Sequence, residues 1–264
     1  MKNIDLKDAN IGIDSHIQMP KCILKQFVNE YNAFYYYDVN KSNKQIKKGH
    51  PKSLNTQKGY YSLSVERKLQ NLVETPLGGK INYVNSDFDT PKDVPFDFRD
   101  VALTYLHSLI ARAPRTYSVI EKQSILLKLF NNLSDREKND FAVESVMAEA
   151  NKKSPFEDYI VTMIVNKTDI PFILPIGGMY SYGDFVCSPL SPHRGIALVK
   201  QNTKLCNELM DGNVCKVLLI ENELVLHQMN KFAINAEVIH NKQYVVSSKK
   251  ELLEMYLKEL YLID

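Results

Sequence analysis

The chain has 264 residues, of which 44% are apolar and 24% are charged. These ordinary values for a globular protein exclude a disordered, collagen-like or coiled-coil chain. The formal net charge is only +2, so any contact with nucleic acid must come from a local basic patch. The length suits one domain spanning residues 1–264, and the alternative is a division into lobes of residues 1–61, 62–152 and 153–264.

The cysteines are scattered along the sequence, at positions Cys22, Cys187, Cys206 and Cys215. Such spacing gives neither a zinc ribbon nor a disulfide framework, so we expect reduced thiols and a cytoplasmic location. The start of the chain mixes charged and apolar residues, which is unlike a secretory signal. No apolar window is long enough to span a bilayer, so we expect no membrane partner.

The N-terminal region is predicted to hold one short helix and a hairpin. Pro20 opens an apolar-periodic run through Val28, which is typical of a helix that begins at a proline. The aromatic run 33–39 indicates a strand, and residues 44–48 can return as its hairpin partner. The polar residues 51–58 are expected to form a loop.

The middle of the chain is predicted to be helical. A helix capped by Ser64 is expected to end or kink at Pro76 and the following Gly78-Gly79 pair. Its buried stripe is Val65, Leu69 and Leu72.

Three more helices are expected, over residues 97–112, over residues 118–130 and from Ser134 to about residue 151. The last begins with a capping box, Ser134 to Glu137. The 97–112 helix is expected to bury Phe98, Val101, Ala102, Tyr105 and Leu109. Its other face would carry Asp100, Thr104, His107 and Ser108.

The C-terminal part alternates short strands and helices. Residues 159–165 and 171–176 are expected to be two strands of one sheet, followed by short strands over 185–187, 195–199 and 244–246. A long helix over residues 221–240 would direct inward Leu224, Val225, Met229, Phe232, Ala233 and Ala236. A second capping box, Ser248 to Glu251, predicts a final helix through Tyr261. The fold class is therefore α+β, with a helical middle layer packed against antiparallel or mixed strands from both ends.

Three short motifs occur along the chain, each once. Residues 16–27 open His-Ile-Gln-Met-Pro and continue to Leu-Lys-Gln-Phe, residues 112–114 read Arg-Ala-Pro, and residues 189–192 read Pro-Leu-Ser-Pro. In this order they resemble the bacterial family named domain of unknown function 4238, whose motifs are His-His-Tyr-Val-Pro, Arg-Thr-Pro and Pro-Leu-Ser-Pro. Residues 174–178 lack the Ser-Asp-x-Pro turn of that family. The resemblance implies positions to test, and no reaction.

The enzyme hypothesis places acid–base or metal-assisted hydrolysis of a phosphodiester on four residues. His16 titrates near neutral pH and precedes a helix whose free N–H groups attract anions. Glu74 lies off the buried stripe, and Arg112 can hold a phosphate with two parallel hydrogen bonds. Tyr61 would orient the substrate or donate a proton. Each has a plainer alternative: a backbone hydrogen bond for His16, a solvated face for Glu74, and a favourable helix-dipole contact for Arg112.

The second hypothesis is a binding module without chemistry. Between residues 40 and 65 there is no acidic residue, and six lysines occur: Lys41, Lys44, Lys47, Lys48, Lys52 and Lys58. Lysines that follow phosphates, beside tyrosines that stack on bases, are typical of single-strand binding surfaces. The alternative is a solvated hairpin whose lysines prevent edge-to-edge aggregation.

The functional expectation is therefore a hydrolase-like effector acting on nucleic acid, in a defence or toxin setting, and the alternative is a nucleic-acid or protein binding module. The sequence predicts no metal-ligand set. The cofactor, the substrate and the oligomeric state stay open at this point.

Overall fold

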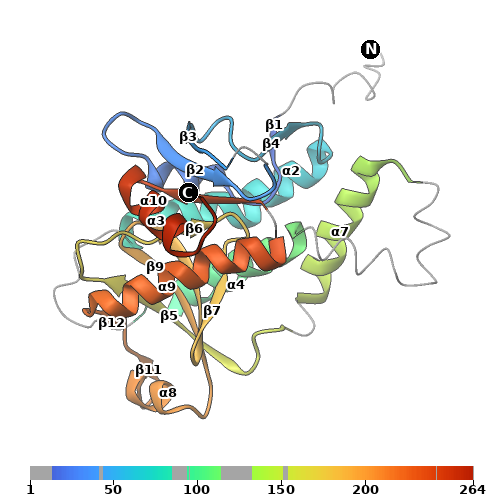
Figure 1. The fold of residues 1–264 in the computed structure, drawn as a ribbon. Helices are drawn as coiled ribbons and strands as arrows, with labels where there is room; N and C mark the ends of the chain where they lie inside the picture. Colours follow the sequence, from blue (N-terminus) through green and yellow to red (C-terminus); the bar gives the residue numbers. More distant parts are fainter. Residues whose placement is uncertain are drawn as a thin grey trace.

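The computed structural model describes residues 14–41, 44–84, 94, 96–113, 133–150, 154–241 and 243–263. The helix predicted over residues 118–130 lies outside these ranges. Helices and strands are mixed along the chain, with two main sheets and helices packed against them (Figure 1). The prediction of an α+β fold is confirmed.

The N-terminal region forms two pairs of strands. Strands β1 (Asp14–His16) and β4 (Thr56–Lys58) pair antiparallel, so the prediction of a loop throughout residues 51–58 was wrong at its end. Between these strands lie α1 (Lys21–Leu24) and the 3-10 turn η2 (Lys25–Phe27), which begin after Pro20 as predicted. The predicted hairpin is confirmed as β2 (Phe34–Asp38) and β3 (Ile46–Gly49).

A four-stranded antiparallel sheet joins the two ends of the chain, in the order β3-β2-β13-β6. Strand β13 (Tyr244–Ser247), predicted over 244–246, pairs with both β2 and β6 (Leu174–Pro175). Residues 171–176 were predicted to join the 159–165 strand in one sheet, and this was wrong. Only Leu174 and Pro175 form a strand, and they pair with β13 because the chain turns away after β5 at Asn166.

The second sheet has five strands in the order β12-β5-β9-β8-β7. Its centre is β5 (Tyr159–Asn166), whose apolar, β-branched residues are buried on both faces. The sheet is completed by β7 (Tyr180–Tyr182), β8 (Phe185–Ser191), β9 (Arg194–Lys200) and the parallel strand β12 (Leu218–Ile220). The Pro-Leu-Ser-Pro segment lies mostly in β8, where the pairing with β9 shifts its register between Pro189 and Ser191.

A small excursion leaves this sheet after β9. It consists of α8 (Lys204–Leu209) and the hairpin of β10 (Met210–Asp211) with β11 (Val214–Cys215). Figure 1 shows it projecting from the main body.

The first long helix runs without a break through α2 (Leu63–Leu69), the π turn η3 (Gln70–Glu74) and α3 (Thr75–Val84). Its cap is Ser62 rather than Ser64, because the Ser62 hydroxyl accepts a hydrogen bond from the N–H of Val65 at 3.3 Å. The prediction that the helix could end at Pro76 was wrong, because the helix continues to Val84. The π turn η3 lies directly before this proline, whose ring in a regular α-helix would meet the carbonyl of Leu72.

The described residues form two hydrophobic cores, and the first contains residues of α2 and α3. Two further helices cover this first core. Helix α4 (Phe96–Arg112) matches its prediction, except that His107 and Ser108 are buried instead of facing solvent. Helix α7 (Asp135–Ala150) begins with the predicted capping box, in which the N–H of Ser134 donates to Glu137 at 2.8 Å and the N–H of Glu137 donates back at 3.4 Å. Helices α4 and α7 pack against each other.

The C-terminal helices cover the second hydrophobic core, which contains residues of the five-stranded sheet. Helix α9 (Glu223–Ala236) continues into the π turn η4 (Glu237–Asn241), and it lies across the sheets in Figure 1. Leu224 and Phe232 were predicted to face inward but are 72% and 52% exposed. Helix α10 (Lys250–Glu259) is confirmed, although its predicted cap is wrong, because Lys249 occupies the cap position and its side chain makes no capping hydrogen bond.

No helix within the described ranges is both long enough and apolar enough to span a bilayer.

Candidate functional site

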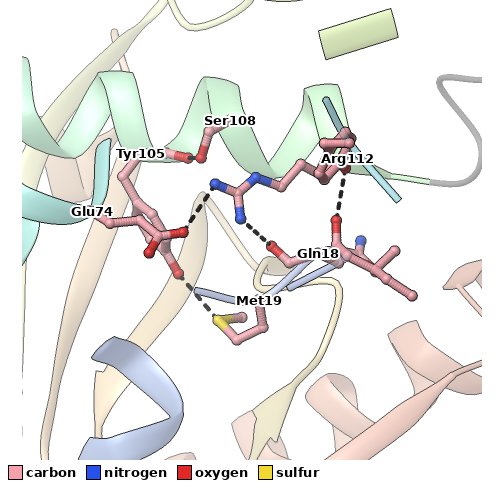
Figure 2. Close-up of polar contacts among 8 residues, drawn as sticks. Gln18, Met19, Glu74, Tyr105, Ser108 and Arg112 are labelled. Carbon is pink, nitrogen blue, oxygen red and sulfur yellow. Dashed lines mark hydrogen bonds and ion pairs between the residues drawn. The ribbon is translucent and has the colours of Figure 1, made fainter. Parts of the chain in front are cut away.

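The inner face of α4 carries a line of polar residues in an otherwise apolar core. Tyr105, Ser108 and Arg112 are spaced three and four residues apart, so they share one face of the helix. All three are buried. The hydroxyl of Ser108 donates to the carbonyl of Tyr105 at 2.6 Å, and the hydroxyl of Tyr105 reaches the sulfur of Met19 at 3.7 Å. Figure 2 shows the guanidinium of Arg112 extending from this face towards Glu74 and Gln18.

The guanidinium of Arg112 is buried but only loosely held. Its side chain is 1% exposed, while that of Glu74 is 28% exposed. Nη2 lies 3.4 Å from Oε1 of Glu74, and Nη1 donates to the backbone carbonyl of Gln18, also at 3.4 Å. Within the described residues Nε is buried without a hydrogen bond. Because charged hydrogen bonds normally measure about 2.7–2.9 Å, the donors of this arginine are incompletely used.

Glu74 reaches Arg112 because the helix around it widens. In η3 the N–H of Thr75 donates to the carbonyl of Gln70, five residues earlier. The extra residue rotates everything that follows, so Val73 continues the buried stripe and Leu72, predicted to be buried, is 57% exposed. Such π turns inside α-helices often occur at functional sites.

A second carboxylate belongs to the same electrostatic environment. Burial raises the pKa of Glu66, and the Ser15 hydroxyl and the positive charge of Arg112 partly oppose this rise. Its Oε1 atom is buried without a hydrogen bond to the described residues. Burial therefore favours the protonated form of the Glu66 carboxyl group.

Gln18 is the least expected member of the site. Its side chain is fully buried, and neither atom of its amide makes a hydrogen bond with the described part of the chain. A buried amide without partners costs about 1–3 kcal/mol, so it is rarely kept without a ligand, water or function. The sequence offered one signal, a polar residue inside the motif 16–27, but not its burial.

Tyr61 lies at the edge of this group and is fully engaged. Its hydroxyl donates to the carbonyl of Ile17 at 2.9 Å, and its N–H donates to the Ser15 hydroxyl at 3.5 Å. Burial raises the pKa of Tyr61, which disfavours a role as proton donor near neutral pH. Its contacts hold the 15–18 segment in place beside Arg112.

His16 is separated from the group by strand geometry. Ser15 and His16 are successive residues of β1, so their side chains leave opposite faces of the strand. Ser15 faces Tyr61 and Glu66, and His16 is therefore directed to the other face. The structure thus brings together Glu74, Arg112 and, at the edge, Tyr61.

The nearby cysteine is not a nucleophile. Burial raises the pKa of Cys22 to about 11, with a smaller contribution from the negative charge of Glu74. The thiol therefore stays protonated at neutral pH, and the thiolate is the reactive form.

The basic stretch runs from the end of β2 through the edge strand β3 to β4. Five of its six lysines are exposed, and Lys47 is half-buried. Lys47 and Lys48 belong to β3, the edge strand, and the ammonium of Lys48 lies 5.7 Å from the centre of the Tyr31 ring. Tyr37 and Tyr61 are buried and cannot stack on bases. Lysines on an edge strand also discourage pairing with another sheet, which is the plainer role considered above.

The described ranges contain no cluster of three or more His, Cys, Asp or Glu residues able to hold a metal ion. Comparisons of the chain with models of protein families, with functionally described proteins and with solved structures find no match. Family membership therefore stays a prediction based on the motifs themselves.

Proposed function

We propose that the group of Gln18, Glu66, Glu74 and Arg112 is the active site of a hydrolase acting on phosphodiesters of nucleic acid. The observation that supports this best is the buried guanidinium of Arg112, whose contacts are long and whose Nε is unused within the described residues. A phosphate oxygen pair matches the fork of such a guanidinium. The unpartnered amide of Gln18 supplies one further donor.

The two carboxylates take different roles because their environments differ. Glu74 is partly exposed and acts as the general base, taking a proton from the attacking water. The water oxygen forms a bond to phosphorus while the bond to the leaving oxygen breaks. Glu66, whose pKa is raised by burial, donates its proton to that leaving oxygen. Arg112 stabilises the negative charge that grows on the phosphate oxygens, replacing its contact with Glu74.

The proposed substrate class follows from the lysines. Strand β4 carries Lys58 and leads directly to Tyr61 at the site, and β3 carries Lys47 and Lys48. If a polyanion lay along these lysines, each ammonium group would neutralise the charge of one phosphate. The proposed setting is an effector in the cytoplasm of a bacterial cell, in defence or as a toxin.

The test uses cleavage of end-labelled single-stranded RNA and DNA in single turnovers. We expect Glu66→Gln and Glu74→Gln each to slow cleavage by about 100-fold or more, since loss of a general acid or base has this effect. The matched control is Glu144→Gln, an exposed carboxylate of α7 that pairs with Lys68 of α2. Wild-type rate should also fall as pH rises through the pKa of Glu66, and Glu66→Gln should lose this dependence.

Two results would overturn the proposal. One is a folded wild-type protein that cleaves neither polymer. The other is a pair of folded variants, at Glu66 and at Glu74, that cleave at the wild-type rate. Salt-sensitive retention of the polymers without cleavage would instead support the binding module, and its lysine contacts would be tested by replacing Lys48, Lys52 and Lys58 with glutamine.

A further inference from the structure

A separate cavity of about 580 Å³ lies between the end of α4, strand β7 and helix α9 with its π turn η4. We call it the α4–α9 cavity. Its apolar lining includes Leu109, Met179, Tyr180, Phe232 and Ile239. This volume and this lining are those of sites that bind small molecules. None of the residues of the proposed hydrolase site lines this cavity, so the following inference is independent of that proposal.

The floor of the α4–α9 cavity is held by unusual backbone features. Gly178 has a φ of +79°, and a Cβ placed there would lie 2.5 Å from Cδ1 of Leu109. The neighbouring N–H of Gly177 donates to the buried carboxylate of Glu237, the first residue of η4. Both contacts join loop 176–179 to the helices on either side, so the cavity is shaped before any ligand arrives.

The wall on the α9 side holds apolar side chains that are exposed to solvent and that a ligand would cover. Phe232 is 52% exposed and Ile239 is 63% exposed, although both line the cavity. The ring of Tyr182 fixes Phe232 by edge-to-face packing at 5.5 Å between ring centres. Covering these two side chains with a ligand would remove apolar surface from water and stabilise the complex.

The α4–α9 cavity is lined by few polar side chains. They are Tyr180 and Ser181 of β7, and Asn235 and His240 of α9 and η4. Among the described residues that line it there is no Asp, Glu, Lys or Arg. A charged ligand would lose its hydration here without gaining a counter-charge, whereas a neutral one would gain hydrogen bonds at one end.

We propose that the α4–α9 cavity binds an uncharged, mainly apolar small molecule whose few polar atoms face Ser181, Asn235 and His240. The ligand would lie against Leu109 and Tyr180 and be covered on its open side by Phe232 and Ile239.

The experiment measures fluorescence of phenylnaphthylamine, a neutral apolar probe, titrated against the full chain. We expect saturable binding at one site, and binding at least about tenfold weaker for anilinonaphthalene sulfonate, the anionic probe of similar shape. Phe232→Ser should weaken the binding of the neutral probe by about tenfold or more, because a large apolar contact is lost.

The control is Leu224→Ser, which removes an exposed apolar side chain (72% against 52% for Phe232) from the same helix but outside the cavity. It should bind the probe as the wild type does. The proposal is overturned if the wild type shows no saturable binding, if the anionic probe binds as tightly as the neutral one, or if Leu224→Ser and Phe232→Ser weaken binding equally. All variants change exposed positions, and circular dichroism would confirm that each is folded.

Discussion

Replacing Gly178 by alanine tests how the loop between β6 and β7 is joined to α4. The residue has a φ of +79°, and a left-handed conformation costs an alanine about 1–2 kcal/mol. In addition, the new Cβ would lie 2.5 Å from Cδ1 and 2.9 Å from Cδ2 of Leu109, a buried side chain. Overpacking of this kind costs about 1–3 kcal/mol. The expected loss in the free energy of unfolding is therefore about 2–5 kcal/mol.

The assay is urea unfolding followed by circular dichroism, where such a loss lowers the midpoint by about 1–2 M. Gly183→Ala is the matched control, because Gly183 has a φ of +55° but open space where a Cβ would be. It should lose only the conformational part. In the double variant Gly178→Ala with Leu109→Ala, the clashing atoms are gone. Its loss should be about 1–3 kcal/mol smaller than the sum of the single losses. Additive losses, or equal losses for Gly178→Ala and Gly183→Ala, would refute the close approach.

Three further predictions concern stability. Burial lowers the pKa of His107, so as pH falls the unfolded chain binds a proton before the folded chain does. The free energy of unfolding should therefore decrease from pH 7 to pH 5. His107→Gln should make this decrease smaller, as measured by urea titrations at each pH. Asn230→Leu should cost at least about 2 kcal/mol by urea unfolding, because it leaves the N–H of Ile173 and the carbonyl of Pro171 buried without their partner. Ser134→Ala should cost about 0.5–2 kcal/mol by thermal unfolding, since it removes the cap of α7.

Each of these has its own control. An unchanged pH slope in His107→Gln would show that His107 does not titrate differently in the two states. For Asn230, the exposed Asn207 changed to leucine should have little effect, and a similar loss in both would contradict the network. For the cap, Ser134→Asp should keep most of the stability, because aspartate also accepts the hydrogen bond from the N–H groups of the first turn.

Local sequence signals predicted the elements whose contacts are local. The β2–β3 hairpin and the capping box at Ser134 depend on residues close in the chain, and both are present. The failures share one cause, which is that the deciding contact is distant. Residues 174 and 175 pair with β13, some seventy residues later, and no pattern within 171–176 carries that information.

The helix around η3 shows a second limit of prediction from hydrophobic spacing. Regular spacing predicted Leu72 in the core, but one inserted residue in the π turn exchanges it for Val73 and turns Glu74 towards Arg112. The energy that keeps this turn comes from packing against other helices, which a single segment does not reveal.

The amino-acid sequence by itself determined the class of fold and most element positions, and it named Glu74 and Arg112, two members of the proposed site. Tertiary structure alone decided that Gln18 and Glu66 stand beside them, that His16 faces away, and that a cavity forms against α9. The physical reason is that hydrophobic periodicity specifies which face of an element is buried, whereas the identity of what covers that face depends on how the whole chain packs.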